Sequence, residues 1–276
     1  MASGALHRTA RVTGHFGEFL QGRLGPDGPV VLVTLPCPAL AAEASYDPSG
    51  PFQAVVDPQG PLDRDQVHAL LACLQDPPTG TASVKADMIA GGGAGASTAA
   101  RVALIRAATG QKDPDRERDI CLRLEGATDP LMHTDPASLL WASRTGEIVQ
   151  HLPAPPVFDV LGGYLGAPER TDPADTRFAD ISDLIPRWTA ACQAGDTAQT
   201  AALATESARR NAAHRGAEPL DTLLDIARST GALGLASAHT GSARALLFDP
   251  GAGDVPVANK ALAALGATNL IRFSTC

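Results

Sequence analysis

The segment that most limits how this chain can fold is a glycine-rich loop, Ile89-Ala-Gly-Gly-Gly-Ala-Gly-Ala-Ser-Thr-Ala-Ala100. A strand-like stretch (residues 83–89) precedes it, and an apolar helical pattern (residues 97–108) follows and closes at Gly110. The glycines allow positive φ angles and a close approach to a ligand. The start of the helix offers unpaired N–H groups and the positive end of its dipole. The sequence therefore predicts a strand–loop–helix unit suited to binding phosphate.

Of two well-known phosphate loops, one is excluded in this segment and the other fits it weakly. A Walker loop needs lysine directly before the Ser/Thr, and that position is Ala96 here. A dinucleotide-binding loop needs an acidic residue at the end of the next strand, about 20 residues on. Residues 110–120 instead have the pattern of a turn and a helix. A phosphate loop of another family, or a tight glycine turn that binds nothing, remains.

Charge and hydropathy narrow the class of partner. The formal net charge is −8, and no lysine–arginine cluster is present, which argues against nucleic acid. The longest apolar runs, such as residues 30–35, are far short of the ~20 residues that cross a membrane. The N-terminal residues lack the apolar region of a secretory signal, so we expect a cytoplasmic protein with a small-molecule partner. Five scattered cysteines without a CxxC pair argue against a disulfide framework.

The order of predicted elements changes at a proline-rich segment, residues 151–156. Before it, we expect a strand at residues 30–35 and helices at 62–75 and 114–124, the first capped by Asp63 with Gln66. After it, the pattern is β-α-β-β-α-β, as in ferredoxin-like folds, with residues 182–194 inserted. The strands are expected at 157–165, 233–238, 243–248 and 269–273, and the helices at 196–214, 220–229 and 256–265.

Three segments in order resemble the motifs of the GHMP kinases (galactokinase, homoserine kinase, mevalonate kinase and phosphomevalonate kinase). GGGAGASTAA resembles the second motif, which holds the phosphates of ATP without a Walker lysine. GHFGEFLQG (residues 14–22), followed by VLVTLP, is similar to the first motif in one branch of the family. That branch contains the L-threonine kinases of cobalamin biosynthesis and propanediol utilisation. GLASAHTGS (residues 234–242) resembles the third motif.

This resemblance implies an α+β, GHMP kinase-like fold of two domains. Residues 1–153 would form an ATP-binding domain like domain 2 of ribosomal protein S5, and residues 154–276 a ferredoxin-like domain. It also implies ATP and Mg²⁺, and transfer of the γ-phosphoryl group to an alcohol, with L-threonine the favoured acceptor. Members of the family are often dimers, so a homodimer is expected.

The resemblance also implies which residues form the site. Ser97 and Glu125 would hold Mg²⁺, and Asp129 would be the catalytic aspartate. Asp135 precedes a proline as Asp129 does and is the rival for that role. The loop residues expected at the ATP phosphates are Gly91, Gly92, Gly93, Ala94, Gly95, Ala96, Ser97 and Thr98.

The acceptor site is expected between the first and third motifs. His15 is interpreted as a solvent-facing turn residue. A substrate carboxylate favours an arginine, but the sequence does not choose among Arg144, Arg177 and Arg244. The residues expected to bind the acceptor are Glu18, Gln21, His239, Thr240 and Gly241.

The chain also departs from the family pattern. Ala96 stands where the family often has a serine, Ile89 where it often has proline, and one extra residue separates Glu125 from Asp129. Three alternatives therefore stay open. They are a kinase of this fold for homoserine or a sugar, a catalytically inactive nucleotide-binding regulatory protein, and a dinucleotide-dependent oxidoreductase.

Overall fold

The computed structural model describes residues 7–170, 172–215 and 220–276, so the first six residues of the N-terminal segment without a secretory signal lie outside them. The strands are β1 (Arg8–Arg23), β2 (Val30–Pro51), β3 (Gln53–Val56), β4 (Thr79–Ala86), β5 (Leu139–Ala142), β6 (Glu147–His151), β7 (Asp159–Tyr164), β8 (Gly234–Ser237), β9 (Ala243–Phe248) and β10 (Thr268–Ser274). The helices are α1 (Arg64–Ala72), α2 (Ala96–Thr109), α3 (Pro114–Glu125), α4 (Leu184–Ala194), α5 (Thr197–Arg215), α6 (Leu220–Thr230) and α7 (Val255–Ala264), with a 3₁₀ turn, η1 (Pro136–Ser138).

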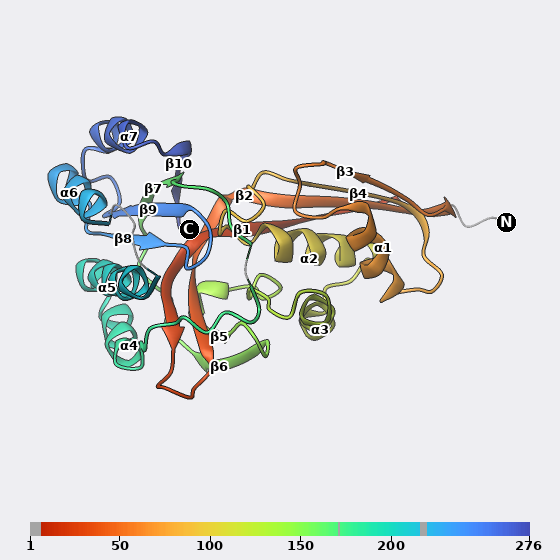
Figure 1. Cartoon of the computed structure of the whole chain (residues 1–276), viewed down its shortest axis with the longest axis horizontal. Helices are drawn as coiled ribbons and strands as arrows, with labels where there is room; N and C mark the ends of the chain where they lie inside the picture. Colours follow the sequence, from red (N-terminus) through yellow and green to blue (C-terminus); the bar gives the residue numbers. More distant parts are fainter. Residues whose placement is uncertain (1–6, 171, 216–219) are drawn as a thin grey trace.

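One sheet runs through the described residues in the order β10-β7-β9-β8-β1-β2-β4-β3, with β5 and β6 attached beside β2. The long hairpin β1–β2 is its spine (Figure 1). Among the named strands only β3 and β4 pair in parallel. A dinucleotide-binding unit needs parallel strands on either side of its loop, so the oxidoreductase alternative loses its structural basis.

Strand β2 is much longer than the sequence predicts. The expected strand at residues 30–35 is only its first part, because β2 continues past Pro36 and Pro38 to Pro51. The prolines do not end the strand because the ladder is irregular there: Gly14 pairs with Cys37, but its neighbour Thr13 pairs with Ala41. Proline is tolerated at such a bulge, where no ladder N–H is required.

Helix α2 lies along the β1–β2 spine with α1 and α3 beside it, whereas α4–α7 gather at the other end of the sheet (Figure 1). The buried face of α2 is rich in alanine, including Ala99, Ala100 and Ala103, which lets this helix approach the strands closely. The predicted α1 is confirmed in a shorter form, with a capping box between Asp63 and Gln66. The core that α2 closes supports the loop at its N-terminus.

The C-terminal half confirms the predicted β-α-β-β-α-β order. Its strands lie side by side as β10-β7-β9-β8, with adjacent strands antiparallel. The insertion forms α4, whose Trp188 is fully buried against Phe19 of β1 at a ring-centroid distance of 5.2 Å. The sheet continues from β8 to β1 through the pairing of Glu18 with Ser237. The division at residue 153 stays a prediction. No helix among the described residues has the length and apolarity to span a membrane.

Candidate functional site

Backbone hydrogen bonds join the glycine-rich loop to the other two motif segments. The carbonyl of Gly93 accepts from the amide of Gly17 in β1 at 2.9 Å. The carbonyl of Gly92 accepts from the amide of Ser242, the last residue of the third motif segment, at 3.1 Å. Residues far apart in the chain therefore meet around residues 91–95, as the order of motifs predicts.

Glycine is required in this loop because other chain segments lie so close. At Gly93, φ is +81°, and an added Cβ would lie 2.3 Å from the Cβ of Ala238. At Gly95, φ is +70°, and an added Cβ would lie 2.6 Å from the ring of His15. Any larger residue would be strained and would separate the three motifs. These two glycines thus serve packing between motifs as well as access for a ligand.

The loop opens onto a cavity of about 290 Å³, the main cavity, at the N-terminus of α2. Gly95 caps the helix in the left-handed conformation, and no side chain pairs with the first amides. Those amides and the helix dipole favour an anion here. The main cavity is lined by most of the residues selected from the sequence, namely Glu18, Gln21, Gly91, Gly93, Ala94, Gly95, Ala96, Ser97, Thr98, Glu125, Asp129, His239 and Thr240.

Two of the expected residues lie outside the main cavity. Gly92 is buried, and a Cβ on it would meet the Tyr164 ring at 2.5 Å. Gly241 faces an adjoining cavity. Neither residue lines the main cavity: Gly92 packs against Tyr164, and Gly241 packs against the backbone of residues 91–93. Their expected roles at the phosphates and the acceptor stay predictions. Asp135 is not at the main cavity either, since it precedes η1, so Asp129 is the better placed of the two rival aspartates.

Asp129 is held by two side chains from distant segments. Its Oδ2 lies 3.4 Å from the Thr98 hydroxyl and 3.4 Å from Nε2 of His15. The Asp129 amide also donates to Thr98 Oγ1 at 3.3 Å. The carboxylate is therefore fixed beside the glycine-rich loop, facing the main cavity.

His15 is the cavity-lining residue whose environment sequence reasoning most clearly misjudged. It is only 2% exposed, so the interpretation as a solvent-facing residue is wrong. Burial lowers its pKa, but the charge and contact of Asp129, the charge of Glu18 and the carbonyl of Gly17 outweigh this and raise the pKa to about 9. His15 is therefore an imidazolium at neutral pH. The missing side chain of Gly95 makes room for it, a relation between distant segments that spacing along the chain does not reveal.

Glu18 and Gln21 project from β1 into the main cavity, where the sequence predicts the acceptor site. Burial raises the pKa of Glu18 to about 7, against the opposing effects of His15 and of the His239 backbone amide. Oε2 of Glu18 and Oε1 of Gln21 are buried without a hydrogen-bond partner in the described part of the chain. Unpaired buried acceptors are costly, so a ligand with donor groups would stabilise this end.

Ser97 and Glu125, the expected metal ligands, are already linked to each other. The Ser97 hydroxyl hydrogen-bonds to Glu125 Oε1, and Arg101 donates to both, at 2.6 Å from Glu125. Burial raises the pKa of Glu125, and Arg101 opposes this. Arg101 is 2% exposed, and sequence reasoning missed it. A cation on the alanine-rich face of α2, four residues after Ser97, indicates a buried polar partner on that face.

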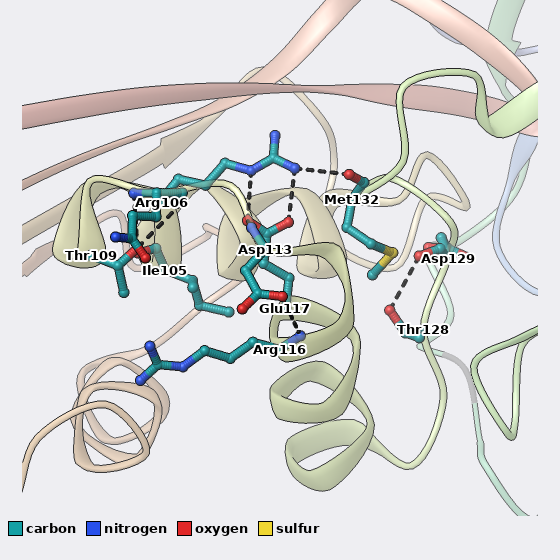
Figure 2. Close-up of polar contacts among 10 residues, drawn as sticks. Ile105, Arg106, Thr109, Asp113, Arg116, Glu117, Thr128, Asp129 and Met132 are labelled. Atoms are coloured by element: carbon teal, nitrogen blue, oxygen red, sulfur yellow. Dashed lines mark hydrogen bonds and ion pairs between the residues drawn. The ribbon is translucent and has the colours of Figure 1, made fainter.

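A buried ion pair fixes the segment that follows Glu125. Arg106 donates to both oxygens of Glu117 at 2.8 Å and to the carbonyl of Met132 at 3.0 Å (Figure 2). Helix α3 ends at Gly126 in the left-handed conformation, so the chain turns before it reaches Asp129. Glu125 and Asp129 therefore both line the main cavity despite the extra residue between them.

The three candidate arginines lie in different places. Arg144 donates to the carbonyls of Asp172 and Asp175 and lines neither cavity. Arg177 and Arg244 line the adjoining cavity together with Arg215, which sequence reasoning missed. We call this space of about 200 Å³ the arginine cavity.

Comparison by sequence identifies nothing: no family model and no curated protein matches the chain. Comparison by structure finds kinases. The L. major mevalonate kinase superposes with a TM-score of 0.67 at 16% identity, covering 97% of this chain and 94% of that one. The Streptococcus pneumoniae phosphomevalonate kinase gives 0.64 at 14% identity, covering 97% and 99%. Homoserine kinase from Cytophaga hutchinsonii gives 0.61 at 15% identity, covering 96% and 93%. The chain therefore has the α+β fold of GHMP-family kinases over nearly its full length.

Proposed function

We propose that this chain is an ATP-dependent kinase of the GHMP type, which transfers the γ-phosphoryl group of ATP to an alcohol, most favourably to L-threonine. The observation that carries the proposal is a single cavity lined by the phosphate-type loop, Ser97, Glu125 and Asp129. The fold shared with known kinases and the three motif resemblances support it.

Backbone amides bind the phosphates in this proposal. The amides of residues 96–98 start α2 and carry no side-chain cap. Phosphate oxygens satisfy such groups and interact favourably with the helix dipole. The acidic net charge of the chain does not oppose this, because the attraction is local to the loop and the helix end.

The residues present fit a magnesium ion carried in with the nucleotide. Mg²⁺ takes one or two protein carboxylates and otherwise phosphate and water oxygens, and Glu125 with the Ser97 hydroxyl offers such hard oxygens. Bound there, the ion would neutralise charge on the phosphate oxygens. Before the nucleotide binds, Arg101 contacts both of these residues, so the ion would share them with the guanidinium.

Asp129 accepts the proton of the acceptor hydroxyl as its oxygen attacks the γ-phosphorus and ADP leaves. The His15 imidazolium and Thr98 hold the carboxylate for that approach. Glu18 and Gln21 provide acceptor oxygens for an ammonium group, which an amino-acid alcohol such as L-threonine carries. The partner is thus a small molecule, not a nucleic acid or a membrane. We propose further that the protein is cytoplasmic and a homodimer.

The direct test is ADP release from Mg·ATP with L-threonine, L-serine, L-homoserine and common sugars. Release that depends on L-threonine alone supports the full proposal. Release with another acceptor keeps the kinase and removes threonine. ATP binding without release for any acceptor favours the inactive alternative, for which the specific observation is that Arg101 already occupies Ser97 and Glu125.

A further inference from the structure

The arginine cavity adjoins the main cavity, and the two share His239 and Glu169. Three guanidinium groups line it, from Arg177 before α4, Arg215 at the end of α5 and Arg244 in β9. Among the described lining residues the one carboxylate is Glu169; Asp175 lies behind the lining, and Glu18 is close enough for the charge of Arg244 to lower its pKa. Among the described lining residues, three arginines thus face one carboxylate, although the whole chain is acidic.

Arg215 is held rigidly and keeps donor groups for a ligand. Its Nε donates to Nε2 of His239 at 2.9 Å, and its Nη2 donates to Asp175. Neither bond uses Nη1, whose N–H groups have no protein acceptor among the described residues. A guanidinium oriented by two fixed acceptors loses little entropy when it binds an oxyanion.

The residues that hold Arg215 are themselves packed in place. The ring of His239 stacks on Phe178 with a centroid distance of 3.9 Å and an interplanar angle of 3°. Burial and the charge of Arg215 lower the pKa of His239 to about 3, so the ring is neutral, and Nε2 accepts while Nδ1 carries the proton. Although burial opposes it, hydrogen bonds from Arg177 and the charge of Arg215 lower the pKa of Asp175 to about 2.

The arginine cavity lies directly behind the acceptor end of the main cavity. The His239 backbone amide and the charge of Arg244 both lower the pKa of Glu18, while the charge of Asp129 raises it. Glu18 thus lies between the catalytic aspartate and the arginines. An acceptor whose hydroxyl is at Asp129 extends past Glu18 toward His239.

A second unpaired group in the arginine cavity also indicates a ligand. Oδ1 of Asn211 is buried there without a hydrogen-bond partner in the described ranges. It would accept a hydrogen bond from a donor beside the anionic group, such as an ammonium or a hydroxyl.

We propose that the arginine cavity binds an anionic group of the acceptor, a carboxylate or a phosphate, and so selects alcohols that carry one. That the bound molecule is an acceptor rests on the proposed function. Anion binding itself does not, because it can be measured without catalysis. It assigns Arg215 and Arg177 to substrate selection and gives them no part in phosphoryl transfer.

The test is calorimetric binding without nucleotide, using L-threonine, glycerol 3-phosphate and L-threoninamide, which lacks the carboxylate. We expect L-threonine or glycerol 3-phosphate to bind, and the stronger of the two identifies the group as carboxylate or phosphate. Arg215→Met and Arg177→Met should weaken that binding about 10- to 100-fold, since a hydrogen bond to a charged group is worth one to two powers of ten. L-threoninamide should bind weakly and with equal affinity to all variants.

Arg209→Met is the matched control, because Arg209 is exposed on the same helix and lines neither cavity. Arg177 is 59% exposed, so its variant tests the proposal even if Arg215→Met does not fold. No binding of either anionic probe, or equal affinity in the arginine variants and the control, would overturn the proposal. Loss of anion binding in a protein that releases no ADP keeps the site and removes the kinase. ADP release with an unchanged KM for the charged acceptor in both arginine variants would keep the kinase and remove the anion site.

Discussion

The two ends of the main cavity are built from different groups. At the proposed phosphate end, one continuous segment, residues 93–98, lines the cavity and presents the backbone amides that start α2. At the acceptor end, side chains from β1, from the segment after α3 and from the β8–β9 turn come together, with His15, Glu18 and Asp129 at the centre. A backbone site tolerates many side-chain changes but few changes at glycine. A side-chain site has the opposite sensitivity, so substitutions at the two ends should differ in their effects.

The largest effect is expected at the acceptor end. Asp129→Asn should lower kcat by about 10²- to 10⁴-fold, the usual range for loss of a positioned general base. Binding of Mg·ATP, measured by calorimetry, should change little because the phosphate end is intact. Asp135→Asn is the control and should keep normal turnover, since Asp135 lies away from the cavity. Equal losses in the two variants would contradict the assignment of Asp129.

The next largest effect is expected on the free energy of unfolding, through the buried ion pair that holds the segment before Asp129 and Met132. Arg106→Met leaves the fully buried Glu117 carboxylate without its cation, which should cost about 3–5 kcal/mol of unfolding free energy. Urea unfolding measures this. Adding Glu117→Leu should recover most of the loss, and Arg116→Met on the exposed face of α3 is the control. A loss no greater than that of the control would mean that the ion pair does not hold this segment.

The charge of His15 gives the acceptor end a pH dependence. Its pKa of about 9 lies above the unfolded value of 6.5, so its stabilisation is complete below pH 6.5 and is lost as pH rises through 9. The free energy of unfolding of the wild type should therefore exceed that of His15→Gln by on the order of 2 kcal/mol at pH 6. The difference should shrink by pH 9.5. A difference that grows with pH would show that His15 is not charged in the folded protein.

The smallest expected effect is at the metal-binding residues. Arg101→Met frees Ser97 and the charge of Glu125 for Mg²⁺, so nucleotide binding should reach half-saturation at about 3- to 10-fold lower Mg²⁺. Ser97→Ala should shift it in the opposite direction. Calorimetric ATP titrations at several Mg²⁺ concentrations measure both. No shift in Arg101→Met would show that the arginine does not share ligands with the metal.

The difference between the two ends also explains what the sequence could predict. The loop, the helix after it and the β-α-β-β-α-β half follow from local spacing, and the structure confirms them. Burial of His15 depends on the absent side chain of Gly95, eighty residues away. The approach of Arg215 to His239 depends on how α5 packs on the sheet. Such contacts between distant segments determine the side-chain environment at the acceptor end, so spacing along the chain does not predict it.

If the two ends of the cavity act on one reaction, ³¹P NMR of the protein with Mg·ATP and L-threonine should detect it. We expect the signals of ADP and of a phosphate monoester on the threonine hydroxyl, both absent with Asp129→Asn. Bound ATP that stays intact with L-threonine, or a monoester that forms equally well with Asp129→Asn, would contradict this expectation.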